Sequence, residues 1–202
     1  MFKLPSDVCS HLQRGGTLLV PTSQRVRAVQ LARAAAGIAA AQRVWASADV
    51  LTPSGWARRE CERLASESPA EWPRLLTGAE EWLLWREATQ EAAAGYPFLD
   101  TGQLAELLQR SSERGAAYRI VVRVPAPDSE AALLLDAQRG FDARCRALNA
   151  ESVTTVMPRL AGAAAAGARS RVLLRGFDTL PPWLALLAPP GASGAASGTA
   201  TS

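Results

Sequence analysis

Two short apolar runs lie near the ends of the chain, and each is followed by a polar turn. Residues 17–21 lead into a turn at 22–25, and residues 171–175 lead into a Gly-Phe-Asp turn at 176–178. Both runs are bounded by turn-forming residues, which is typical of buried strands. The pattern predicts a strand, a turn and then a helix in both places.

Apolar residues at helical spacing predict helices along most of the chain. Thr22 or Ser23 can cap one of them, Thr77 and Glu80 form a capping box, and Ser129 can cap a third. The expected helices lie at residues 3–14, 23–41, 53–67, 130–148 and 151–160, with two more starting after Thr77 and at Thr101.

Several segments are less regular. Residues 43–46 are a candidate second strand that continues towards residues 49–51. Residues 120–124 fit either a strand or a helix. Pro158 is expected to interrupt the helix at 151–160, because proline removes a backbone donor. The alanine-rich segment 162–167 predicts a loop or a frayed helix.

The order strand, helix, strand, helices, strand predicts an α/β fold. Its small parallel sheet would be of the degenerate P-loop helicase type, with an inserted helical subdomain. We expect an N-terminal α/β part at 1–76, a helical insertion at 77–168, a returning strand and helix at 169–188, and a disordered low-complexity tail at 189–202. A sheet with only three or four strands would be incomplete. The chain is therefore expected to be a fragment or a truncated product.

Composition excludes several classes of protein. The 202 residues are 48% hydrophobic and 20% charged, which suits a folded core. Three distant cysteines and one histidine argue against a disulfide framework and a zinc site. The sequence has neither a secretory signal nor an apolar run of about 20 residues. We therefore expect a cytoplasmic protein with no metal, no cofactor and no membrane partner.

Charge is distributed unevenly along the chain. Residues 1–59 carry eight Lys or Arg and two Asp or Glu, a net of +6. Residues 60–142 carry eight against fifteen, a net of −7, and residues 143–202 carry six against two, a net of +4. The basic ends can face phosphates, and any single arginine can equally belong to a solvated face.

Six tryptophans invite a base-stacking interpretation. Trp45, Trp56, Trp82 and Trp85 lie on apolar faces or strands, which favours packing in the core. Trp183 follows a proline pair and is the one expected to be partly exposed.

Five segments, in this order, resemble the N-terminal helicase-like region of AddB-like bacterial DNA repair proteins of the PD-(D/E)XK nuclease superfamily. They lie at residues 18–25, 44–56, 75–85, 141–147 and 172–182. The resemblance implies a role in DNA end processing, with DNA and a helicase or nuclease subunit as partners. The nuclease site of the family lies beyond the matched region, so this chain alone is expected to be non-catalytic.

The first turn is the place where a phosphate loop would enter its helix. Ser23, Gln24, Arg25 and Arg27 are the candidates to hold a DNA or nucleotide phosphate; a plain strand-to-helix turn is the alternative. The only lysine is Lys3, far from any such turn, which argues against ATP hydrolysis.

Asp178 is a candidate vestigial acidic motif, because a carboxylate after such a strand binds Mg²⁺ in active motors. A turn residue or helix cap is the alternative for Asp178. For the whole chain, the alternatives are a scaffold that binds only protein, through the acidic middle, and a nonfunctional truncated product.

Overall fold

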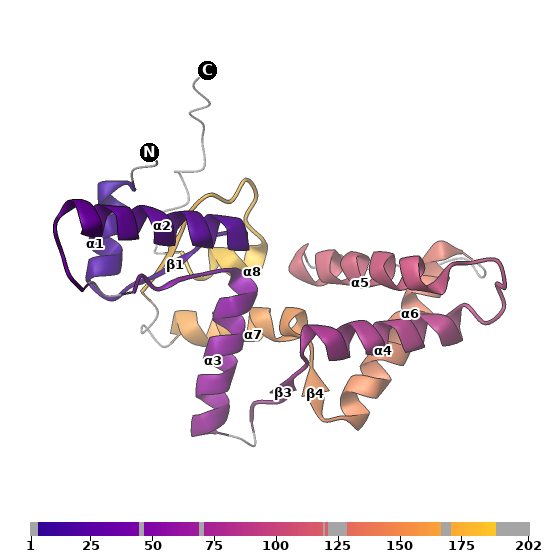
Figure 1. Ribbon diagram of the computed structural model, residues 1–202. Helices are drawn as coiled ribbons and strands as arrows, with labels where there is room; N and C mark the ends of the chain where they lie inside the picture. The colour runs from indigo at the N-terminus through magenta and orange to yellow at the C-terminus, as the bar shows by residue number, and fades with distance from the viewer. Residues whose placement is uncertain are drawn as a thin grey trace. The chain divides into compact units, whose positions relative to one another are not determined.

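The computed structural model describes residues 4–44, 47–68, 71–118, 120, 129–166 and 171–188. In these residues the chain is mixed α/β, with eight helices and five short strands (Figure 1). The chain divides into two compact units. Unit 1 comprises residues 1–59 and 158–202, and unit 2 comprises residues 60–157. The expected bounds of the helical insertion, 77–168, stay a prediction.

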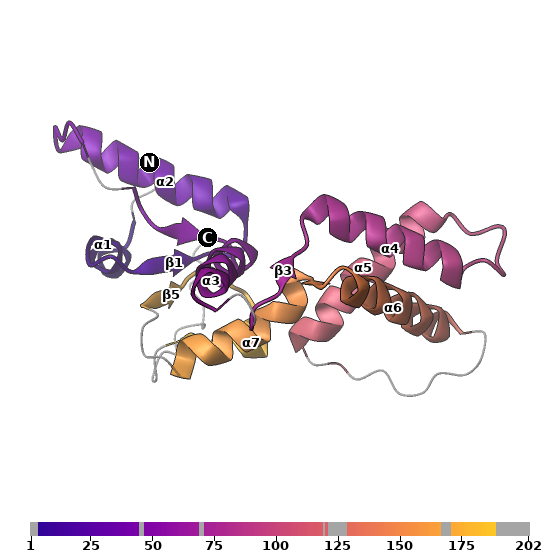
Figure 2. The same ribbon diagram turned by 90° about the horizontal axis from the view of Figure 1, so that it is seen from below.

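A three-stranded parallel sheet forms the centre of unit 1. Its strands are β1 (Thr17–Leu19), β2 (Val50–Leu51) and β5 (Val172–Leu174), in the order β2-β1-β5. Leu18 of β1 is in register with Val50 on one side and Leu173 on the other. Figure 2 shows β1 and β5 side by side. The expectation of a small parallel sheet is confirmed.

Helices α1 (Ser6–Gln13), α2 (Ser23–Ala39) and α8 (Pro182–Ala185) belong to unit 1. Val8 and Leu12 of α1 and Val29 of α2 pack against Leu18 and the neighbouring buried residues of the sheet. The core of unit 1 therefore depends on both helices that flank β1 in the sequence. Helices α3 (Pro53–Glu67) and α7 (Val153–Ala166) each cross the boundary between the units.

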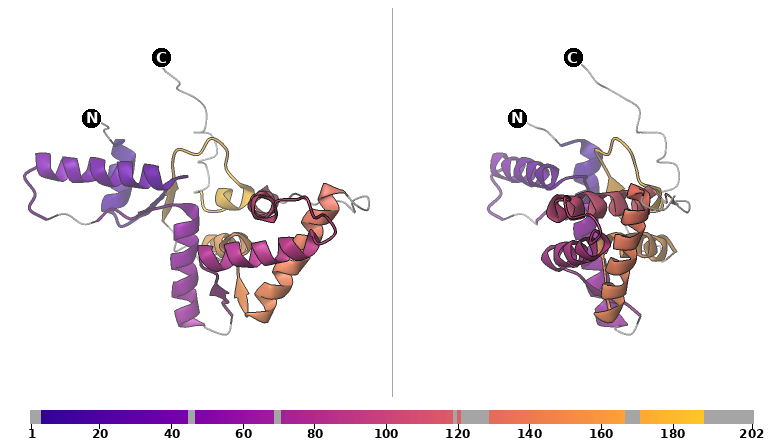
Figure 3. Two further views of the ribbon diagram at one scale, coloured as in Figure 1. Left: turned by 45° about the vertical axis from the view of Figure 1, so that its right-hand side comes forward. Right: turned by 90° about the vertical axis from the view of Figure 1, so that its right-hand side faces the viewer.

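Three helices form most of unit 2. They are α4 (Gly78–Ala92), α5 (Thr101–Tyr118) and α6 (Glu130–Ala147), and α4 packs against both others (Figure 3). A two-stranded parallel ladder joins β3 (Arg74–Leu75) to β4 (Ala150–Glu151). The rings of Trp85 and Phe141 stack in the core with centroids 4.6 Å apart.

The structure confirms the expected caps. The hydroxyls of Thr22 and Ser129 accept hydrogen bonds from backbone N–H groups three residues on. Thr77 and Glu80 make both bonds of the capping box at the start of α4. The starts of these helices could be predicted from the sequence, because short polar side chains satisfy the free backbone N–H groups there.

One expectation about α7 is wrong, and a two-stranded ladder in unit 2 was not predicted. Helix α7 continues through Pro158 to Ala166 instead of ending near Leu160. Val156, Leu160 and Ala161 are all buried, and this apolar face holds the helix on both sides of the proline. The β3–β4 ladder was not expected, because strands of two residues have no readable alternation of apolar and polar positions.

Two tryptophans differ from expectation. Trp183 is only 4% exposed, because α8 turns it into the core, and Trp82 is 44% exposed on α4. Trp56 and Trp85 are buried as expected. Trp45 lies outside the described residues.

Other expected features also fall wholly or partly outside the described residues. Residues 43 and 44 are not in a strand, and the rest of the candidate strand 43–46 is not described. Residues 121–124 of the ambiguous segment and the tail at 189–202 are likewise outside the described part of the chain.

Candidate nucleic-acid interface

The first two turns of α2 carry most of the residues that the sequence singled out. The Thr22 hydroxyl accepts a hydrogen bond of 3.3 Å from the Arg25 backbone N–H and so caps the helix. The first turn contains no acidic residue. The partial positive charge of a helix N-terminus is therefore combined with the guanidinium groups of Arg25 and Arg27.

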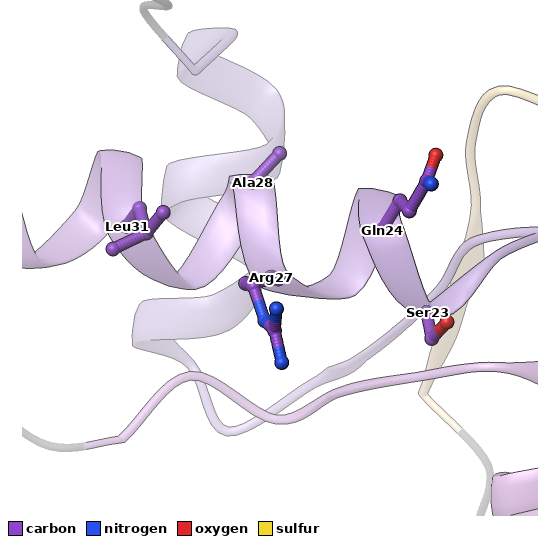
Figure 4. A pocket seen from close by; sticks show the side chains of 5 residues that line it. All are labelled: Ser23, Gln24, Arg27, Ala28 and Leu31. Atoms are coloured by element: carbon purple, nitrogen blue, oxygen red, sulfur yellow. The ribbon is translucent and has the colours of Figure 1, made fainter.

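A recess of about 320 Å³ lies along this part of α2. We call it the α2 recess, and it is lined by Ser23, Gln24, Arg27, Ala28 and Leu31 (Figure 4). Ser23 and Arg27 project from one side of the helix, as expected for residues four apart. Hydroxyl, amide and guanidinium groups beside an apolar side chain suit a phosphate next to a planar or apolar group.

Arg27 is the most available cation of the α2 recess. It is exposed, and no hydrogen bond or ion pair engages its guanidinium within the described residues. An unengaged arginine on the first turns of a helix can donate several hydrogen bonds to a phosphate.

Arg25 joins the two polar turns that the sequence singled out. Its Nη1 donates a hydrogen bond of 2.6 Å to the carbonyl oxygen of Gly176, 151 positions along the chain. Gly176 has φ +75°, in the left-handed region that favours glycine. A Cβ atom there would collide with the Arg25 guanidinium. The turns follow the neighbouring strands β1 and β5, at the carboxyl edge where open parallel sheets bind ligands.

Asp178 lies in the same turn as Gly176 and is exposed. Within the described residues it makes no hydrogen bond or ion pair. Helix α8 has Pro181 at its N-cap position, so the cap interpretation of Asp178 is wrong. No group of three His, Cys, Asp or Glu side chains gathers as a possible metal site in the described part of the chain. The vestigial acidic role of Asp178 stays a prediction.

Sequence reasoning missed the ion pair between Arg175 and Asp7. Arg175 directly follows β5, and its Nη2 contacts the Asp7 carboxylate on α1. Desolvation alone would raise the pKa of Asp7, but the hydrogen bond and charge of Arg175, with backbone N–H groups, hold it below its ordinary value. The position of Arg175 at the end of an apolar run is the signal that could have found it.

A second polar cluster ties the amino ends of the sheet together. Arg59 on α3 contacts Asp49 at 2.6 Å and donates a 3.1 Å hydrogen bond to the Thr17 hydroxyl. The Thr17 hydroxyl in turn donates to Asp49. Because these contacts connect β1, the residue before β2 and α3, they serve the fold at the edge away from the α2 recess.

The two units carry opposite net charges. Unit 1 has twelve Lys or Arg and three Asp or Glu, a net of +9, whereas unit 2 has ten against sixteen, a net of −6. Two of the three carboxylates of unit 1, Asp7 and Asp49, are already paired with arginines. Unit 1 therefore has a large excess of cations over the anions that could neutralise them.

Comparison with models of protein families and with curated proteins gave no match. No helix in the described residues combines the length and apolar character needed to cross a membrane.

Proposed function

We propose that this chain is a non-catalytic, helicase-like module of a DNA repair protein that processes DNA ends. The proposal extends the sequence resemblance to the N-terminal region of AddB-like nucleases. In it, the three-stranded sheet corresponds to a degenerate P-loop helicase core, and unit 1 contacts the DNA backbone.

The charge of unit 1 carries the proposal. A net of +9 is concentrated in one compact unit of a chain whose total is only +3. Clustered arginines attract the phosphate backbone whatever its sequence, and they release bound counterions when they meet it. The class of ligand that fits such a unit best is a nucleic acid.

The α2 recess gives the contact a location. Arg27 is unengaged, Ser23 and Gln24 add polar groups, and Arg25 stands on the same first turn. The Leu31 side chain is exposed beside them and offers an apolar surface for a base. The site binds without hydrolysis in this proposal, because the sequence has no lysine at this turn to hold a transferred phosphate.

Fluorescence anisotropy with labelled single-stranded and duplex DNA tests the proposal. Between about 50 and 200 mM salt, the logarithm of the binding constant should fall linearly with the logarithm of salt concentration. Reversing Arg25 and Arg27 to glutamate should weaken binding at least about tenfold. On single strands, loss of two phosphate contacts should also make the salt slope shallower by about 1.4.

The matched control reverses two exposed arginines of unit 2, Arg110 and Arg139, to glutamate. It changes the net charge of the chain by the same amount, so its binding should stay near that of the parent. Absence of binding at low salt, or an equal loss in both double variants, would contradict DNA contact through α2.

A second candidate function is docking of a protein partner through unit 2. The unit has a net charge of −6, and Trp82 and Leu83 are exposed side by side in the sequence of α4. A chain that lacks DNA affinity and instead binds a helicase or nuclease subunit with little dependence on salt would favour this candidate.

A further inference from the structure

Unit 1 contains a second cavity, of about 420 Å³, that differs from the α2 recess in chemistry. Its wall is mainly apolar and includes Val8 of α1, Leu18 of β1, Val20 just after β1 and Val29 of α2. We call it the strand-end cavity, because it lies where β1 and β5 end. Its volume falls in the range of protein pockets that enclose a small ligand or a bulky side chain.

Two guanidinium groups belong to the same cavity. Arg25 and Arg175 both line it, together with Gly176. A mostly apolar wall with a few convergent polar groups is the usual composition of a specific binding site. The combination indicates a ligand with a bulky apolar part and an anionic part close to it.

The two arginines differ in whether a carboxylate neutralises their charge. Among the described residues, no carboxylate pairs with Arg25, whose guanidinium donates only to the neutral carbonyl of Gly176. Arg175 is paired with Asp7, but both side chains are about half exposed. Exposed ion pairs contribute little to stability, so an incoming carboxylate can replace Asp7 at modest cost.

We propose that the strand-end cavity binds a peptide segment of a partner protein that has a large apolar side chain beside a carboxylate, such as an acidic C-terminus ending in phenylalanine. The apolar side chain fills the space over Leu18 and Val20, and the terminal carboxylate bonds to Arg25 and Arg175. The net charge of +9 on unit 1 attracts the acidic residues that precede the terminus. The proposal goes beyond DNA contact and does not depend on it.

The test uses the full chain and a fluorescein-labelled peptide of four aspartates followed by a C-terminal phenylalanine. Two control peptides carry either a C-terminal amide or glycine in place of phenylalanine. The free acid should bind about tenfold more tightly than the amide, because charged hydrogen bonds are lost in the amide. The glycine peptide should bind about tenfold more weakly as well, because the apolar wall is left unfilled.

Variants of the chain give effects of opposite sign. Arg25→Gln and Arg175→Gln should each weaken binding of the free acid about tenfold. Asp7→Asn releases Arg175 from its internal partner and should strengthen binding, which a misfolded variant would not do. Arg43→Gln, at an exposed arginine of unit 1 that lines neither cavity, should bind as the parent does.

Three results would overturn the proposal. The first is equal binding of the acid and the amide, and the second is weaker binding or no change in Asp7→Asn. The third is equal weakening in Arg43→Gln and Arg25→Gln, which would indicate general attraction of an acidic peptide to a basic unit. DNA binding is measured separately in the same variants, so failure of one proposal leaves the other intact.

Discussion

The stacked rings of Trp85 and Phe141 connect α4 to α6 at the centre of unit 2. Their planes differ by 16°, and both residues are buried, with Trp85 only 2% exposed. Offset stacking of buried aromatic rings stabilises beyond the apolar area removed from water. This single contact therefore links the two helices that pack most extensively in the unit.

Phe141→Ala should lower the free energy of unfolding by about 3–5 kcal/mol, because it removes the ring and leaves a cavity. Urea denaturation followed by circular dichroism measures the change. Phe98→Ala is the matched control, because Phe98 is 99% exposed, and its free energy of unfolding should stay close to that of the parent. Similar losses in the two variants would show that Phe141 is not a core residue.

At the scale of elements, the capping box of α4 is the clearest case of a local sequence signal that fixes a helix start. The Thr77 backbone N–H donates to Glu80 at 2.8 Å, and Arg74 reaches the same carboxylate at 2.8 Å. The bond from the Thr77 backbone lowers the pKa of Glu80 most, followed by those from the Arg74 and Thr77 side chains, and together they bring it to about 2.

A pKa lowered in the folded state stabilises the protein only while the group is ionised. The contribution of Glu80 is therefore complete above its ordinary pKa of 4.5 and disappears as the pH falls towards 2. Urea denaturation at several pH values measures the free energy of unfolding of the parent and of Glu80→Gln. The parent should be more stable at pH 7, and the difference between the two proteins should disappear as the pH falls from 4.5 towards 2. A gap of constant size from neutral to acidic pH would contradict the role given to Glu80.

Helix boundaries could be predicted from the sequence where a capping residue was visible. The predictions failed where the boundary depends on packing against residues elsewhere in the chain. Helix α3 has the expected bounds, and α6 ends one residue before its expected end. The course of α7 through Pro158 and the burial of Trp183 depend on tertiary packing, which no local pattern encodes. The candidate residues on α2 could be chosen from the sequence, but the bond from Arg25 to Gly176 joins distant positions and required the folded chain.

At the scale of the whole molecule, the three cysteines report on folding. Cys61 and Cys145 are buried, whereas Cys9 on α1 is partly exposed. Burial raises the pKa of Cys145 to about 11, and the carboxylates of Asp142, Glu81 and Glu151 add to the increase. Because the thiolate is the reactive form, Cys145 is protected both by lack of access and by its proton.

Alkylation with iodoacetamide at pH 7.5, read by mass spectrometry, should modify Cys9 first in the folded chain. Cys61 and Cys145 should react only as the protein unfolds, and all three should react in concentrated urea. The rate at the buried pair should follow the unfolded fraction measured by circular dichroism. Early modification of Cys145 in native buffer would contradict the packing of α6 described above.

The backbone at Gly176 also determines how the chain tolerates substitution. Any other residue would adopt a left-handed conformation that costs roughly 1–2 kcal/mol, and its Cβ would also displace the Arg25 guanidinium. Gly15 has a similar φ of +74°, but no atom lies within 4 Å of the position that a Cβ would take, so asparagine or aspartate would be strained there only by the backbone conformation. In a survey of all single substitutions, Gly176 would therefore tolerate as few replacements as a residue that binds a ligand, although glycine has no side chain to bind one. Intolerance there would reflect the space that an arginine needs to connect two turns.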